Sequence, residues 1–168
     1  MSSETILKLG DVSIPAGAGR GISQSLDLID NGQIRRTING DLRNLTRALS
    51  RKFSSNISVV DLDSPAFRGL WRGQILLVEC ITRFNQNVSP EASVVDLIRP
   101  FASGSVIGYD AGGQKVAIDA ISGQEITFDS DVRFVSFRPV IEFMITGIST
   151  GSEEYDASVS WSIDLEEV

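Results

Sequence analysis

The strongest constraint on the fold is a strict alternation of apolar and polar residues near the end of the chain. Four apolar residues alternate there with four polar ones: Val159, Trp161, Ile163 and Leu165 with Ser158, Ser160, Ser162 and Asp164. The segment 140–147 has the same period of two, and the polar stretch 149–156 separates the two segments. Successive side chains of a strand point to opposite faces, so the pattern predicts an antiparallel pair with one face in the core and one polar face.

The rest of the chain repeats this pattern in shorter pieces. Short apolar runs are bounded by Gly, Asn, Asp, Ser and Pro, and 15 glycines are spread along the 168 residues. Strands at such spacing predict a mainly β fold, an antiparallel β-sandwich or barrel with at most one or two short helices. Helical expectations are limited to residues 46–52, which could be one helical turn or a polar crossing, and to a short helix over 91–98. We expect a single β-rich domain over residues 1–168, with a candidate insertion over 85–105.

Two hairpins are predicted from turn chemistry. Asn39-Gly40 lies between two alternating runs and favours a type I′ turn, in which both residues have positive φ. The stretch Asp110-Ala111-Gly112-Gly113 predicts a second hairpin.

The predicted core combines the most apolar run with the final strand pair. The run 75–81 is expected to be a central strand covered on both faces. The residues expected to be buried are Ile75, Leu77, Cys80, Phe143, Ile145, Val159, Trp161 and Ile163.

Histidine is absent from the sequence, and Cys80 is the one cysteine. This excludes the Ser-His-Asp and Cys-His relays and all histidine metal sites. Cys80 is interpreted as a small buried hydrophobic residue that forms no internal disulfide. We therefore expect no enzyme activity, no catalytic residues, no cofactor and no metal site.

A glycine-rich segment resembles a phosphate-binding loop, and two Asp-x-Asp pairs resemble parts of a calcium site, but structural roles explain both patterns better. Gly17-Ala18-Gly19-Arg20-Gly21 lacks the spacing of a phosphate-binding loop, so a flexible turn or a close backbone contact with a neighbouring subunit is the better interpretation. Asp61-Leu62-Asp63 and Asp129-Ser130-Asp131 could place paired carboxylates near calcium. The full calcium-loop pattern is missing, and aspartate is also common in turns.

The charge is unevenly distributed along the chain. Residues 1–84 contain 11 basic and 8 acidic residues, whereas residues 85–168 contain 4 and 14. Such asymmetry favours contacts between copies, unless the two halves mix in the folded chain. The candidate interface residues are the basic Arg35, Arg36, Arg43, Arg47 and Arg51 and the acidic Glu153, Glu154, Asp156, Glu166 and Glu167. Nucleic acid is a weaker alternative for the basic stretch, because no aromatic residues are interleaved with it.

Several short blocks are similar to a known group of proteins. They are the segments 35–42, 53–61 and 70–74 and the run that ends in Val78-Glu79-Cys80. The last block is the end of the sequence, where Arg138-Pro139 is followed by an alternating strand and then by the segment 161–168. The sequence resembles a family of small uncharacterised virion proteins encoded among the structural genes of tailed bacteriophages. The resemblance implies a β-rich structural subunit that is present in many copies in the particle.

The expected function is a non-enzymatic subunit of a tail or baseplate ring, or of the tail tip, that contacts other copies and other virion proteins. One alternative is a capsid decoration or cement protein, or a head–tail connector protein. A second alternative is a carbohydrate-binding module at the tail tip, with Trp71 and Tyr155 as its aromatic platform. The start of the chain lacks signal-peptide features and no apolar stretch reaches membrane-spanning length. The chain is therefore expected to stay in the cytoplasm, and the resemblance to virion proteins implies assembly in the host cytoplasm and location in the virion.

Overall fold

The computed structural model describes residues 5–29, 34–44 and 51–168. The chain forms two compact units, each built from segments that are far apart in the sequence. The first unit contains Met1–Ser13 and Leu76–Glu142, and the second contains Ile14–Ile75 and Phe143–Val168. Each unit therefore contains parts of the basic and of the acidic half of the sequence.

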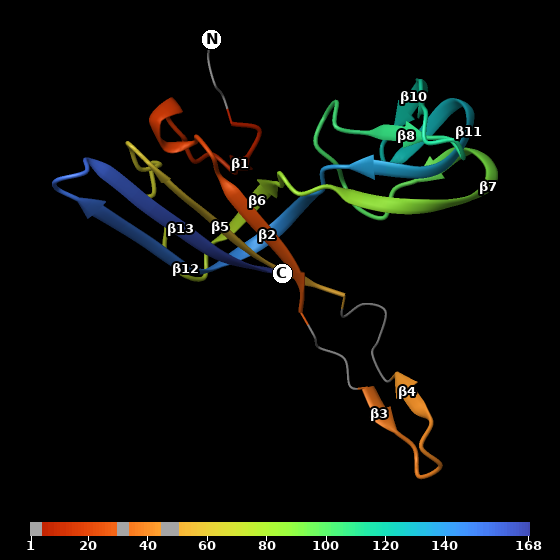
Figure 1. The fold of residues 1–168 in the computed structure, drawn as a ribbon, viewed down its shortest axis with the longest axis horizontal. Helices are drawn as coiled ribbons and strands as arrows, with labels where there is room; N and C mark the ends of the chain where they lie inside the picture. Colours follow the sequence, from red (N-terminus) through yellow and green to blue (C-terminus); the bar gives the residue numbers. More distant parts are fainter. Residues whose placement is uncertain (1–4, 30–33, 45–50) are drawn as a thin grey trace. The chain divides into compact units, whose positions relative to one another are not determined.

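Among the described residues, four antiparallel strands of the second unit are hydrogen-bonded neighbours in the order β2-β5-β13-β12. Their bounds are β2 (Ser23–Leu28), β5 (Phe53–Asp61), β12 (Val140–Glu153) and β13 (Ser158–Glu167). Figure 1 shows these strands side by side. As the alternation predicts, β12 and β13 are antiparallel neighbours, with Ile163 opposite Ile148 and Ser162 opposite Ser149.

One face of this sheet is buried and the other is polar. The buried face includes Ile57 of β5, Phe143 and Ile145 of β12, and Trp161 and Ile163 of β13. The segment around the 3-10 turn η1 (Ala16–Ala18) packs on this side, where the indole N–H of Trp161 donates to the carbonyl of Ala18. The predicted polarity of the final strand pair is confirmed.

In its described residues, the first unit contains six further strands, together with parts of β6 and β12. A short pair joins β1 (Lys8–Leu9) to β6 (Ile75–Glu79), with Leu9 opposite Val78. The other strands are β7 (Phe84–Asp96), β8 (Ile107–Tyr109), β9 (Lys115–Val116), β10 (Ile118–Ser122) and β11 (Glu125–Phe137). The long strand β11 is central because it pairs with β7, β8 and β10.

These strands enclose a hydrophobic core of their own. The core residues come mainly from β11 and the end of β7, and they are Val95, Leu97, Val106, Ile126, Phe128, Val132, Val135 and Phe137. The ring of Phe84 packs edge-on against Phe137, with 6.1 Å between the ring centroids. Burial of this apolar surface is the main stabilising contribution expected for the unit.

The predicted hairpin around Asn39-Gly40 is present as β3 (Ile34–Arg36) and β4 (Leu42–Asn44). Its turn differs from the predicted type I′ form, because Gly40 has φ +86° whereas Asn39 has no positive φ. The N–H of Thr37 bonds to the carbonyl of Asp41, so three residues form the loop. Glycine at the last loop position is typical of such three-residue hairpin loops. The second predicted hairpin is present as β8 and β9.

The mainly β prediction with antiparallel sheets is confirmed, but the short helix over 91–98 is wrong. Residues 84–96 form β7, in which Val95 is buried while Val94 and Asp96 are exposed. Pairing with β11 gives this segment a period of two, which overrides its helical spacing. The helical turn predicted over 46–52 lies largely outside the described residues.

The core prediction is right for five residues and wrong for two. Cys80, Phe143, Ile145, Trp161 and Ile163 are buried, and Val159 is only half-buried. Ile75 and Leu77 are more than half exposed, because β6 is covered on the side of Val78 alone rather than on both faces. Within the described residues, no helix is long and apolar enough to span a membrane.

Candidate functional site

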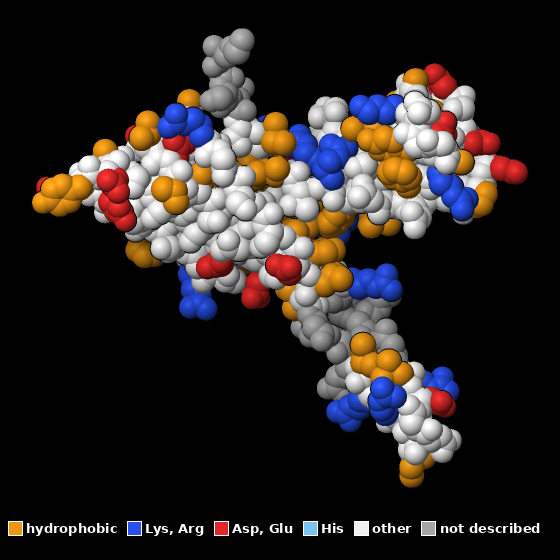
Figure 2. Space-filling model, viewed as in Figure 1, with side chains coloured by type: hydrophobic (Ala, Val, Ile, Leu, Met, Phe, Trp, Pro, Cys, Tyr) orange, Lys and Arg blue, Asp and Glu red, His pale blue; other side chains and the backbone are white. Residues whose placement is uncertain are grey.

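The β3–β4 hairpin presents two different faces. Arg35 of β3 lies directly opposite Arg43 of β4, so both side chains occupy one face, which we call the arginine face. Ile34, Arg36 and Leu42 belong to the other face. Figure 2 shows blue basic side chains beside orange apolar ones along this hairpin.

The side chains of the hairpin are exposed to an unusual degree. Ile34 is 60% exposed, Leu42 is 61% exposed and Ile38 in the turn is fully exposed. Arg35 and Arg43 are like charges directly opposite each other, an arrangement that destabilises a strand pair. Within the described part of the chain, neither of them has an ion-pair partner. A lone two-stranded hairpin is at best marginally stable in water. Contact with another surface would therefore stabilise the hairpin, because it would cover the exposed apolar side chains and could supply acidic partners for Arg35 and Arg43.

The remaining predicted basic residues are less informative. Arg36 donates to the carbonyl of Gly40 and so supports its own turn. Arg51 is exposed just before β5. Arg47 lies outside the described residues.

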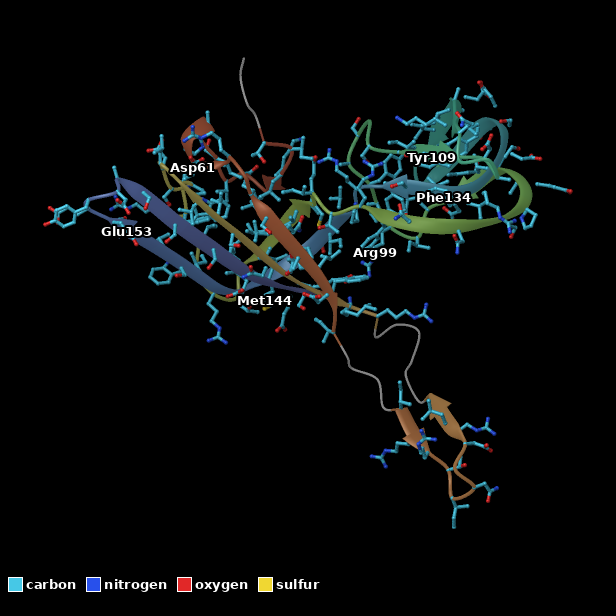
Figure 3. The ribbon with its side chains drawn as sticks, viewed as in Figure 1. Asp61, Arg99, Tyr109, Phe134, Met144 and Glu153 are labelled. Atoms are coloured by element: carbon cyan, nitrogen blue, oxygen red, sulfur yellow. The ribbon has the colours of Figure 1, made fainter. Side chains whose placement is uncertain are left out.

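The predicted acidic residues lie at opposite ends of the β12–β13 pair. Glu153 ends β12, and Glu154 and Asp156 lie in the turn that follows it. Figure 3 shows Glu153 at this end and Met144 toward the other. Glu166 and Glu167 lie at the far end of β13, where the carboxylate of Glu167 accepts the backbone N–H of Phe53 at 3.0 Å. The structure therefore separates the predicted acids into two groups.

The polar side of the second unit's sheet, which we call the outer face, is ordered in rows across the strands. One row consists of four serines opposite one another: Ser23, Ser58, Ser162 and Ser149. The next row is Ser25, Asn56, Asp164 and Gly147. The third row is Asp27, Ser54, Glu166 and Met144.

Two carboxylates that the sequence did not mark as site residues join Glu166 on the outer face. Asp27 and Asp164 are exposed, and both line, with Glu166, a shallow depression of about 240 Å³. The amide of Asn56 donates to Asp164 at 2.7 Å, which fixes one carboxylate within the depression. The alternation of β13 places Asp164 and Glu166 on the polar face, but strand order is needed to bring Asp27 beside them. We call Asp27, Asp164 and Glu166 the acidic end of the outer face.

The serine row lines a second depression of about 380 Å³, together with Ser160 and Val60. Serine hydroxyls can donate and accept hydrogen bonds, and the carboxylates of the neighbouring rows only accept. The outer face is therefore rich in acceptors, and apart from Glu166 and Met144 its three rows consist of short side chains.

The glycine-rich loop and the first Asp-x-Asp motif contact each other. Arg20 donates to Asp61 through its backbone N–H at 2.9 Å and through its guanidinium at 2.9 and 2.6 Å. The side-chain hydrogen bond from Arg20 lowers the pKa of Asp61 against an opposing effect of burial, and it raises the pKa of Arg20. The side chain of Asp61 is 3% exposed, so arginine, rather than an ion from solvent, satisfies this carboxylate.

Backbone hydrogen bonds also connect the glycine-rich loop to the Asp61-Leu62-Asp63 motif. The N–H groups of Leu62 and Asp63 both donate to the carbonyl of Gly17. A β-carbon at Gly17 would overlap the carboxylate of Asp63. The loop thus makes a close backbone contact within the chain, whereas the contact with a neighbouring subunit stays a prediction.

The other candidate residues are not among those that form these surfaces. Asp129 and Asp131 are exposed on β11, and in the part of the chain that the structure describes no group of three or more acidic or cysteine side chains could hold a metal ion. Trp71 and Tyr155 are 75% and 98% exposed in their turns. In the first unit, Tyr109 and Phe134 stack at 4.6 Å between ring centroids (Figure 3).

No protein-family model matches the chain, no curated protein is similar to it in sequence, and no solved structure is similar to it in fold.

Proposed function

We propose that the chain is a non-enzymatic structural subunit of a tailed-phage virion, acting in a tail or baseplate ring or at the tail tip through contacts with other copies. The observation that carries the proposal is the β3–β4 hairpin. Its apolar residues Ile34, Ile38 and Leu42 are exposed, and Arg35 faces Arg43 without an acidic partner among the described residues.

These features describe a segment that gains stability when another surface covers it. Apolar contacts would supply most of the affinity, because exposed ion pairs contribute only about 0–1 kcal/mol each. The charges would instead determine the register and the choice of partner. The sequence resemblance to small virion proteins and the absence of histidine support a structural rather than a catalytic role.

A capsid decoration or cement protein, or a head–tail connector protein, is the second candidate, because it would use the same exposed hairpin against a different neighbour. Self-association separates a ring component, which contacts its own copies, from a decoration or cement protein, which contacts the capsid subunit. A head–tail connector would also contact its own copies, so its position in the particle distinguishes it from a tail ring.

The test is sedimentation velocity of the purified chain over a wide concentration range. Wild type is expected to form oligomers as its concentration rises. The variant Arg35→Glu/Arg43→Glu should associate at least roughly tenfold more weakly while keeping its circular dichroism spectrum.

The matched control is Arg68→Glu/Arg133→Glu, which reverses two exposed arginines outside the hairpin. It changes the net charge by the same amount and should associate like wild type. A wild-type chain that remains monomeric throughout would contradict the ring proposal. Equal weakening by both double variants would show that net charge, rather than the hairpin, controls association.

A further inference from the structure

The outer face of the second unit is a sheet face without a covering layer among the described residues. Ser25, Asp27, Asn56, Asp164 and Glu166 are all exposed on it. The opposite side of the same strands holds the buried core, including Ile57 and Ile163. The outer face is therefore available to a partner.

The chemistry of this face selects the kind of partner. Its acidic end has the carboxylates of Asp27, Asp164 and Glu166, and the neighbouring positions include Ser25, Ser54, Asn56 and Thr146 as well as Met144 opposite Glu166. Arginine carries five N–H donors and no acceptor, so it matches a surface of carboxylate and hydroxyl acceptors. The short serine side chains leave room for the long arginine stem to lie along the sheet.

The arginine face of the β3–β4 hairpin has the matching chemistry. Side chains opposite each other on two strands are about 5 Å apart at Cβ, as for Arg35 and Arg43. Asp164 and Glu166 are two residues apart on β13, which separates their Cα atoms by about 7 Å. Two guanidinium groups on flexible stems can therefore reach two carboxylates at once.

We propose that the outer face is the docking site for the β3–β4 hairpin of a second copy, with Arg35 and Arg43 paired to Asp164, Glu166 and Asp27. The inference rests on the proposed function and adds the receiving surface to it. All five side chains are exposed in the single chain, so the two charged surfaces do not neutralise each other there.

Such a contact is heterologous, because two different surfaces of each copy meet. Repetition of a heterologous contact produces a ring when the rotation closes and a filament when it does not. Each copy would donate one hairpin and receive another.

A charge-exchange experiment tests this contact. The first variant reverses the hairpin (Arg35→Glu/Arg43→Glu), and the second reverses the face (Asp164→Arg/Glu166→Arg). Each variant alone should associate at least tenfold more weakly than wild type in sedimentation velocity. An equimolar mixture should recover association, because each reversed surface then meets a complementary one. The chain with all four substitutions should also recover.

The matched control reverses two exposed acids at the other end of the strand pair, Glu153→Arg/Glu154→Arg, and should leave association unchanged. The docking site would be overturned if the hairpin variant weakened association but the face variant did not. It would also be overturned if Glu153→Arg/Glu154→Arg weakened association in place of the face variant. Both results would leave the proposed function intact. Recovery in the fourfold variant but not in the mixture would show that the hairpin folds onto its own chain. A monomeric wild type would overturn the docking site together with the ring proposal.

Discussion

The indole N–H of Trp161 donates to the backbone carbonyl of Ala18 at 3.1 Å, which ties the final strand β13 to the glycine-rich loop. The same ring meets Phe67 edge-on, with 5.3 Å between the centroids. Trp161 is 2% exposed, so it joins three distant segments in the core of the second unit. The loop is thus held by a side chain that the alternation pattern placed in the core.

Replacement of this tryptophan should therefore be costly. Trp161→Ala is expected to lower the free energy of unfolding by about 3–5 kcal/mol through cavity formation. Trp161→Phe retains a ring but leaves the carbonyl of Ala18 without its donor, at a cost of about 1–3 kcal/mol. Urea denaturation measures both values. Wild-type stability of Trp161→Ala would contradict the packing described for β13.

Gly17→Ala is expected to lower the free energy of unfolding by about 1 kcal/mol or less. The new β-carbon would overlap Oδ2 of Asp63, but this carboxylate is the exposed end of a flexible side chain and can rotate away. The double variant Gly17→Ala/Asp63→Ala has no carboxylate to displace, so it should show no cost from this overlap. A loss of more than about 3 kcal/mol for Gly17→Ala in chemical denaturation would show that the side chain of Asp63 cannot move aside.

The Arg20–Asp61 ion pair makes stability depend on pH in the acidic range. The pKa of Asp61 in the folded chain is below its ordinary value of 3.8, so the unfolded chain binds the proton more readily. The pair therefore stabilises the fold fully above about pH 4, and this contribution is lost as the pH falls through the lowered folded pKa. Thermal melting of wild type and Asp61→Asn should show a gap in Tm at pH 7 that narrows below pH 4. A constant gap would exclude ionisation of Asp61 as its source.

The sequence predicts local structure well where one strand carries its own pattern. The alternation from Ser158 to Leu165 identifies both faces of β13, and the glycines at 40 and 113 locate two hairpins. The run at Ile75 misled because a continuous apolar stretch does not reveal how many faces are covered. The helix expected near Val94 failed because pairing with β11 is a tertiary contact.

In the candidate site too, the residues of one local segment could be predicted, whereas those brought together by tertiary contacts could not. Arg35 and Arg43 could be marked from the hairpin alone, since both belong to one local segment. Asp27 could not be joined to Asp164, because β2 and β13 are more than 100 residues apart and become near neighbours only through β5 between them. The run of basic residues in the sequence thus identifies the arginine face of the hairpin. The acidic end of the outer face can be identified only once the order of the strands is known.

Salt should weaken association of the chain without abolishing it. Raising the ionic strength from about 0.1 M to 1 M shortens the Debye length from about 10 to 3 Å, which screens exposed pairs. Contacts of Ile34, Ile38 and Leu42 are not screened and should persist. Sedimentation velocity at both salt concentrations checks this expectation. Association that strengthens steadily with salt would mean that the charged residues oppose assembly.

The role as a virion subunit is tested by cryo-electron microscopy of phage particles purified from cells that carry the gene. We expect density for both units of the chain, repeated around the tail axis, with each β3–β4 hairpin against the outer face of the adjacent copy. Particles that contain no copy of the chain, confirmed by mass spectrometry of the same preparation, would contradict its role as a virion subunit.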